Sequence, residues 1–190
     1  MKAEKRKAFF HPKSFIESKN IGARTRIWAF THVMKHASIG EDCNIGEHCF
    51  IENCAVIGNR VTVKNGVCLW EGVTLEEDVF VGPNAVFTND SFPVSRRQPA
   101  YFEKIHVKKG ACIGANATIL CGVTVGRYAF IGAGSVVTSN VPDHALVYGN
   151  PSKFKGFLCA CRRKLKWFGR KAHCRCELRY RKISGKVQPT

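Results

Sequence analysis

Four cysteines near the C-terminus fall into two pairs with the same internal spacing. Cys159 and Cys161 are followed, across twelve intervening residues, by Cys174 and Cys176. Four thiolates are a common ligand set of a tetrahedral structural zinc site. The segment is too short to build a core, and a bound metal would offset part of the cost of folding it. The spacing predicts a zinc site, with His173 as an alternative ligand; the competing interpretation is four reduced thiols on a loosely ordered basic tail.

A second candidate for chemistry is the pair Arg96 and Arg97, which lies in the segment 89–106. This segment reads NDSFPVSRRQPAYFEKIH and contains two prolines and three aromatic residues. Two guanidinium groups suit a phosphate or diphosphate, because they combine positive charge with planar hydrogen bonding. The alternative is two solvated surface arginines.

Charge is distributed unevenly over the 190 residues. The chain has 30 Lys and Arg against 14 Asp and Glu, a formal charge of +16. Residues 1–150 account for 17 basic and 13 acidic residues, and residues 151–190 for 13 and 1. A nearly neutral body therefore carries a tail of charge +12. The tail could attract anionic substrates or contact an anionic membrane surface, and nucleic-acid binding is the less favoured partner.

The sequence shows neither an apolar run of about 18 residues nor a secretory signal. We therefore expect a cytoplasmic protein, in which ten cysteines favour free thiols or a metal over disulfides.

The elements that must position these residues follow from a six-residue period. Large apolar residues recur at every sixth position, and the period resumes in a new phase after segment 89–106. The repeated positions are Phe15, Ile21, Ile27, Val33, Ile39, Ile45, Ile51, Ile57, Val63, Leu69, Leu75, Val81 and Phe87, then Val107, Ile113, Ile119, Val125, Ile131 and Val137. A helix of 3.6 residues per turn does not fit this pattern, whereas short strands separated by bends do.

Two further positions of each hexad are restricted in size. A small residue follows each apolar position by four, as in Ala37, Cys43, Cys49 and Ala55, which we interpret as buried corner residues. Glycine often follows the apolar position directly, and we expect it to permit the backbone turn.

This pattern resembles the hexapeptide-repeat superfamily, whose fold is an all-β, left-handed parallel β-helix with three hexads per coil. The resemblance implies about six coils over 15–150, with a loop insertion at 89–106. It leaves a basic segment at 1–14 and a cysteine-containing extension at 151–190. Superfamily members typically form homotrimers with active sites in grooves between subunits, and a loop leaving one edge could reach a neighbouring subunit.

Four runs make the resemblance more specific. They are IGARTRIWAFTHV (21–33), CLWEGVTLEEDVFVGPNAVFTND (68–90), IGANATILCGVTVGRYAFIGAGSVVT (113–138) and VPDHALVYGNPSK (141–153). They are similar to acetyl-CoA-dependent N-acetyltransferases of 3-amino sugars carried on UDP or dTDP, which supply bacterial surface polysaccharides. The chain departs from that branch at Ala29, where relatives commonly have His, and at Val94, where they often have Arg.

The resemblance implies roles for three residues in acyl transfer to an amine. Asn89 would orient the amine through its amide oxygen, which does not favour the charged ammonium as a carboxylate would. Glu71 would accept hydrogen bonds from sugar hydroxyls or the amine, and His32 is the best histidine for acid–base work. The alternatives are that Asn89 begins a turn and that Glu71 is a solvated carboxylate.

The remaining candidates bind the two substrates. Asn65, Asp90, Arg96 and Arg97 are expected to contact the nucleotide-linked sugar. Acetyl-CoA is expected along the C-terminal coils, where small residues let its arm approach the backbone. The residues nominated for it are Ala115, Arg127, Gly132, Ala133, Gly134, Ser135 and Lys153.

Some relatives also end in a ribbon-like cysteine module, in which glycine usually follows the second cysteine of each pair. Here Arg162 and Glu177 occupy those places.

Three other functions stay open. One is another hexapeptide-repeat O- or N-acyltransferase. A second is a zinc lyase of the carbonic-anhydrase type, although the spacing of His32 and His36 and the lack of histidine between residues 48 and 106 argue against it. A third is a non-catalytic β-helix scaffold with a nucleic-acid- or membrane-binding tail.

Overall fold

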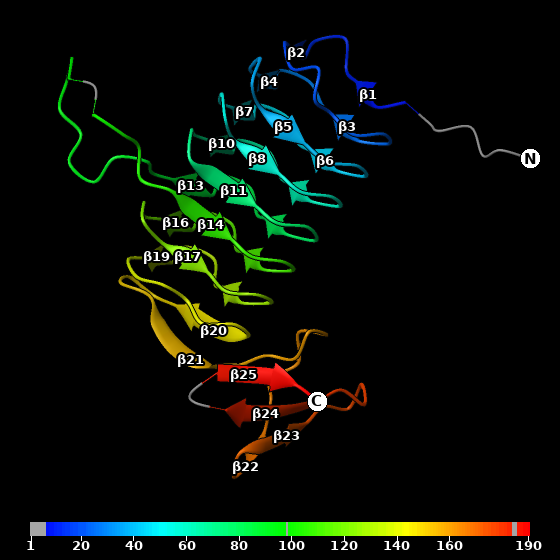
Figure 1. Cartoon of the computed structure of the whole chain (residues 1–190), viewed down its shortest axis with the longest axis vertical. Coiled ribbons are helices and arrows are strands. Elements are labelled where there is room, and N and C mark those ends of the chain that lie inside the picture. The colour runs from blue at the N-terminus through cyan, green and yellow to red at the C-terminus, as the bar shows by residue number, and fades with distance from the viewer. Residues whose placement is uncertain (1–6, 98, 184–185) are drawn as a thin grey trace, which may run out of the picture.

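A computed structural model describes residues 7–97, 99–183 and 186–190. Figure 1 shows a column of short strands stacked coil upon coil, with a small separate sheet at its C-terminal end. The column is a parallel β-helix with three faces. No helix within the described residues is long and apolar enough to span a membrane.

The first face is a sheet of eight parallel strands closed by an antiparallel one. In spatial order these are β1 (Phe9–Phe10), β3 (Arg26–Ile27), β6 (Asn44–Ile45), β9 (Thr62–Val63), β12 (Phe80–Val81), β15 (Cys112–Ile113), β18 (Phe130–Ile131), β20 (Ala145–Tyr148) and the antiparallel β21 (Lys153–Phe157). Eight parallel strands mean about eight coils rather than the six expected, because β1 precedes Phe15 and β20 follows Val137. Strand β1 lies inside the segment 1–14, and residues 1–6 of that segment lie outside the described residues.

The second face consists of two sheets in succession, which meet where β10 contacts β13. Its strands are β2 (Phe15–Ile16), β4 (His32–Val33), β7 (Phe50–Ile51), β10 (Cys68–Leu69), β13 (Val86–Phe87), β16 (Thr118–Ile119) and β19 (Val136–Val137). The third face is one sheet. Its strands are β5 (Ser38–Ile39), β8 (Val56–Ile57), β11 (Val73–Leu75), β14 (Ile105–Val107) and β17 (Thr124–Val125).

Through most of the column, paired strands on one face are separated by the same step along the chain. Arg26 pairs with Asn44 and Asn44 with Thr62, so one coil takes three hexads. Phe80 instead pairs with Cys112, much further along the chain, because the loop is inserted between β13 and β14. The pairing returns to the step of three hexads at once, since Cys112 pairs with Phe130. The loop therefore leaves the stacking of the coils unchanged.

The periodic apolar residues form the core as expected, except at the first coil, where Ile21 is partly buried and Phe15 is exposed. Every one of them from Ile27 onward is buried. Phe15, however, is 61% exposed, and Ile16 takes the interior position because it pairs with Val33. The step from Phe15 to its partner His32 is one residue shorter than three hexads, which moves the inward position by one.

Small corner residues are buried as predicted, and the polar ones hydrogen-bond to the next coil. Thr31 Oγ1 donates to the Gly46 carbonyl at 2.6 Å, and Cys49 Sγ donates to the Lys64 carbonyl at 3.2 Å. Burial raises the pKa of Cys49 to about 11, so this thiol stays neutral and serves as a packing group.

The glycines that directly follow the apolar positions do not form the backbone turn that the sequence had led us to expect. Left-handed backbone occurs two residues after the glycine position, for example at Asp42 (φ 57°) and Asn84 (φ 55°). The glycine is instead needed for close approach between coils. A Cβ on Gly114 would lie 2.5 Å from the backbone nitrogen of Ala133 in the next coil.

The C-terminal extension is an ordered module rather than a loose tail. Its strands β22 (Trp167–Phe168), β23 (Lys171–His173), β24 (Arg179–Ile183) and β25 (Lys186–Pro189) form an antiparallel sheet. A small core supports it, which includes Cys159, Leu165, Cys174 and Tyr180.

The close contact of successive coils predicts that glycines at the tight corners are less replaceable than glycines with open space around them. Gly114→Ala should lower the free energy of unfolding by about 2–3 kcal/mol, because its methyl group meets backbone atoms. Gly134→Ala should cost only about 1 kcal/mol, because its left-handed backbone is strained but nothing lies within 4 Å. Thermal or denaturant unfolding measures both, and equal costs would contradict this account.

Candidate active site

Glu71 and Asn89 occupy the same position of consecutive coils, since one full coil separates them. Each follows a strand of the second face, β10 and β13 respectively, and precedes the third face. The indole nitrogen of Trp70 donates to the Phe87 carbonyl at 2.8 Å and joins the two coils here. We call this edge, where the second and third faces meet, the loop corner.

The loop 89–104 begins and ends at the loop corner. The Glu103 N–H donates to the Asn89 carbonyl at 3.0 Å, so the two ends of the loop meet. Within the loop, Asp90 Oδ1 accepts from the Phe92 N–H at 2.8 Å, and Arg97 Nη2 donates to the Phe92 carbonyl at 3.3 Å. The turn anticipated at Asn89 is thus stabilised by the Asp90 side chain. Figure 1 shows the loop in green, projecting away from its own coils.

A hollow of about 230 Å³ lies at the base of this loop. Asn89, Asp90, Arg97 and Glu103 line it together with Tyr101. Residues with one amide, two carboxylates and one guanidinium therefore line a common space. Arg96 is exposed and does not line it.

Sequence reasoning missed Ser91, Glu103 and Cys121, which cluster at the loop base. Ser91 Oγ hydrogen-bonds to Glu103 Oε1 and lies 3.2 Å from Cys121 Sγ. Cys121 Sγ is also 3.6 Å from Glu103 Oε1. Cys121 is the loop-corner residue of the coil after Asn89, so counting one coil through the loop would have found it. Glu103 had no comparable signal, because the loop has no repeat.

His32 lies apart from this cluster. It belongs to β4, and strands β7 and β10 stand between it and β13 on the second face. His32 Nε2 is 3.0 Å from Glu17 Oε2, and its ring packs against Phe15 and Phe50. Within one chain the structure does not bring His32 to Asn89 or Glu71.

Asn65 lies at a different edge, the corner between the first and second faces. Its Oδ1 accepts from the Glu47 N–H at 3.2 Å, which ties two coils together. Asn59 makes the equivalent bond to the Glu41 N–H at 2.8 Å, so the Asn65 side chain has a structural task within its chain.

Most residues nominated for acetyl-CoA gather at this same corner, further along the column. Ala115 and the run 132–135 lie there in successive coils, and the Gly134 N–H donates to the Ala115 carbonyl at 2.9 Å. Gly134 has open space around it, whereas Ser135 is buried and accepts from the Gly149 N–H at 3.3 Å. Lys153 begins β21 beside Tyr148.

Arg127 is the exception among these residues, because it lies between the third and first faces. Its N–H donates to Asp143 Oδ1 at 2.7 Å, and its carbonyl accepts from the His144 N–H. Arg127 is therefore separated from the other nominated residues by a full face of the prism.

The cysteines of the tail converge as their spacing predicted. The Sγ atoms of Cys159, Cys161, Cys174 and Cys176 all lie within 4.8 Å of one another. His173 is not part of the cluster. Within the parts of the chain that the structure describes, no group of three histidines converges in the way that the lyase alternative needs.

A larger hollow, about 680 Å³, lies at the opposite end of the column beside Arg24, Arg26 and Asp42. Arg24 is already bound there by Asp42 at 2.6 Å and by Glu41 at 2.9 Å. None of the predicted site residues lines this hollow, so its size alone does not make it the better candidate.

Comparison with known proteins agrees with this fold and its repeats. A family profile described as bacterial transferase hexapeptide, six repeats, matches residues 18–53 and 104–139. The two matched stretches lie on either side of segment 89–103, which carries most of the loop. Over these two stretches the chain is similar to bacterial transferases with hexapeptide repeats.

Two curated relatives match parts of the chain. A dTDP-3-amino-3,6-dideoxy-alpha-D-galactopyranose 3-N-acetyltransferase of Aneurinibacillus thermoaerophilus is 52% identical over 89 residues, which are 47% of this chain and 46% of the relative. A galactoside O-acetyltransferase of Lactococcus lactis is 35% identical over 81 residues, or 40% of this chain and 39% of the relative. The matches thus span less than half the length of either relative.

Solved structures share the fold at low sequence identity. The acetyltransferase domain of PglB from Neisseria gonorrhoeae, solved with acetyl coenzyme A, has a TM-score of 0.51 at 21% identity, covering 80% of this chain and 60% of that chain. The polySia-specific acetyltransferase NeuO has a TM-score of 0.52 at 20% identity, covering 80% and 82%.

The bonds at the loop base predict how the loop is held. Glu103→Ala removes the acceptor for Ser91 and Cys121, so the loop should open and trypsin should cleave after Arg97 several-fold faster. Glu47→Ala is the matched control, because the Glu47 side chain makes no hydrogen bond or ion pair with the residues that the structure describes. Fragment masses locate the cut, and equal cleavage rates would show that this cluster does not hold the loop.

Proposed function

We propose that the protein transfers the acetyl group of acetyl-CoA to the 3-amino group of a UDP- or dTDP-linked amino sugar. The observation that carries the proposal is the loop-base hollow, where Asn89, Asp90 and Glu103 face Arg97. A sugar diphosphate needs hydrogen-bond acceptors for its amine and hydroxyls and a cation for its phosphates, and this lining supplies both. The relative from Aneurinibacillus, whose name states such a reaction, supports this substrate class.

The proposed reaction is attack of a neutral amine on a thioester. The Asn89 amide oxygen accepts a hydrogen bond from the amine and aims its lone pair at the carbonyl carbon. Glu71, one coil away on the same corner, accepts from a sugar hydroxyl. Arg97 holds the diphosphate, so the sugar is fixed at both ends.

Proton transfer needs no strongly basic side chain under this proposal. An amine beside electron-withdrawing sugar substituents is less basic than that of lysine, so part of it is neutral near pH 7. The C–N bond forms as the C–S bond breaks, and the departing CoA thiolate, with a thiol pKa of about 8.5, takes the proton that the amine loses. Backbone N–H groups at the corners would stabilise the oxyanion.

We also propose that the active unit is a homotrimer. In one chain the loop corner and the corner carrying Ala115 and 132–135 are separated by the second face. A hexad spans at most about 20 Å, and the face between these two edges keeps them apart within one chain. Packing one chain's loop corner against a neighbour's opposite corner would bring the acceptor sugar to the thioester.

The charge of the tail suits this proposal. None of the ion pairs found within the described residues involves a residue of 151–190. The tail therefore presents uncompensated positive charge, which would attract anionic nucleotide sugar and CoA. The same charge would hold a cytoplasmic enzyme near an anionic membrane surface, where surface polysaccharides are assembled.

The direct test is to incubate the protein with acetyl-CoA and a panel of UDP- and dTDP-linked 3-amino sugars and to follow thiol release. Turnover is expected only with sugars that carry the 3-amino group. Matched sugars with a 3-hydroxyl group serve as controls, and preferential turnover of those would favour an O-acetyltransferase. If CoA binds but no amino sugar turns over, this substrate class is wrong.

A pair of variants tests the placement of the site. Asn89→Ala should lower kcat about 100-fold, because the amine loses its orienting acceptor. His36→Ala should leave the rate within twofold, because His36 is exposed and lies coils away from the loop. Steady-state kinetics on the preferred amino sugar compares them, and equal rates for the two variants would refute the placement.

A further inference from the structure

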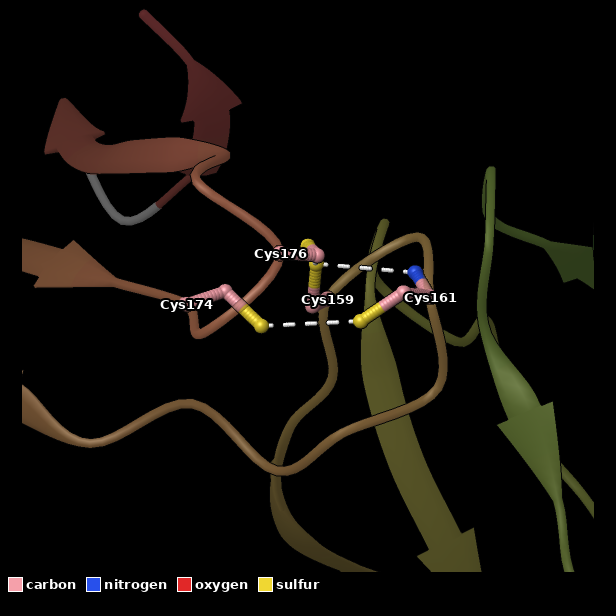
Figure 2. Close-up of side chains that lie close together, drawn as sticks. All are labelled: Cys159, Cys161, Cys174 and Cys176. Atoms are coloured by element: carbon pink, nitrogen blue, oxygen red, sulfur yellow. Dashed lines mark hydrogen bonds between the residues drawn. The ribbon is translucent and has the colours of Figure 1, made fainter.

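The cysteine cluster has the dimensions of a metal site rather than of disulfides. Cys159 Sγ lies 3.4 Å from Cys176 Sγ, and Cys161 Sγ lies 3.5 Å from Cys174 Sγ. Zinc bound to four sulfurs at about 2.3 Å places those sulfurs about 3.8 Å apart, whereas a disulfide bond is about 2.05 Å long. Figure 2 shows side chains from two separate turns meeting at one point.

The two turns that present the cysteines have the same backbone. The N–H of Arg162 donates to the Cys159 carbonyl at 2.8 Å, and the N–H of Glu177 donates to the Cys174 carbonyl at 2.9 Å. The residue that follows each cysteine pair has a left-handed backbone conformation, with φ 71° at Arg162 and φ 72° at Glu177. A left-handed backbone conformation is costly for residues other than glycine. The same strained turn at both cysteine pairs indicates that both pairs present their sulfurs in the same geometry.

Two of the four sulfurs lie in the interior of the C-terminal module, and a hydroxyl group lies beside one of them. Cys159 and Cys174 are buried. The Tyr180 hydroxyl accepts from the Ala160 N–H at 3.0 Å and lies 3.2 Å from Cys159 Sγ. Either the Tyr180 hydroxyl or the Cys159 thiol can be the donor in this contact, and a Tyr180 O–H donor would suit a Cys159 sulfur that binds a metal. A buried thiolate needs such a donor and, above all, a cation.

Charge around the cluster complements a metal–thiolate centre. Four thiolates and one Zn²⁺ carry a net charge of −2. Arg162, Arg163 and Arg175 are chain neighbours of the ligands, and none of them forms an ion pair with a carboxylate within the described residues. The Arg162 guanidinium itself turns to the column, where it donates to the Gly110 carbonyl, so the basic character of the segment is compatible with a negative centre without an ion pair to it.

We propose that Cys159, Cys161, Cys174 and Cys176 bind one Zn²⁺, which joins the two turns and organises the C-terminal sheet. Four protein ligands close the coordination sphere, so the metal is structural and leaves no position for a substrate. The site also secures the end of the column. Arg162, in the first turn, donates through Nη2 to the Gly110 carbonyl at 2.6 Å.

The experiment uses the full-length protein purified under reducing conditions. Metal analysis should find about one zinc per chain, and Cys174→Ser should lower this to near zero. Cys54→Ser is the matched control, because Cys54 is an exposed free thiol of the column and its loss should leave the zinc unchanged. Chelation of the wild-type protein should accelerate tryptic cleavage within 156–190 while the column stays intact.

A spectroscopic measurement keeps the proposal testable if Cys174→Ser fails to fold. Replacing zinc by Co²⁺ in the wild-type protein should give the thiolate charge-transfer and visible bands of tetrahedral cobalt. Less than half an equivalent of zinc, with the four thiols freely reactive, would overturn the proposal. Two disulfides, found by mass after alkylation without reduction, would overturn it as well. Neither result bears on the acetyl-transfer proposal, because the site makes no contact with the loop corner.

Discussion

The structure depends on one constraint, the close backbone contact between coils at the corners where glycine follows the buried apolar residue. Where a Cβ on Gly114 or Gly126 would meet backbone of the next coil within 2.5 Å, only glycine allows the coils to stack. The stacking then repeats every three hexads, and any residue acquires as neighbours the residues one coil before and one coil after it. Stability is local in such a column, because each coil contacts only the coils beside it.

The candidate site follows from this repetition. A strict step places Glu71, Asn89 and Cys121 on one edge in successive coils, although the loop separates the last two in sequence. Because the loop begins and ends at that edge, its side chains are delivered to the same place. Asp90, Arg97 and Glu103 are thus added to a surface that the coils have already built. The periodic column and the irregular loop therefore both contribute residues to the polar hollow.

Much of the fold was predictable because the period is visible in residue type. The core residues from Ile27 to Val137, the buried corner thiols and the place of the loop were all expected from the sequence and confirmed. The first coil was not, since Phe15 is apolar and in phase yet faces outward after a step that is one residue short. Glu103 could not be predicted, because loop residues follow no period and their partners depend on how the loop folds. His32 and Arg127 show a further limit of prediction from sequence. A motif that resembles a family's motif does not show on which face or corner of the column its residues lie.

The antiparallel strand β21 has a consequence for how long the column can become. On the first face, β20 pairs with β18 on one side and with β21 on the other, so its hydrogen-bonding edge is already occupied. An open parallel edge would accept a strand from another molecule and allow end-to-end growth into fibres. By reversing direction once, the chain replaces the parallel edge of this face with an antiparallel strand, so that a further parallel coil would find no matching ladder on this face.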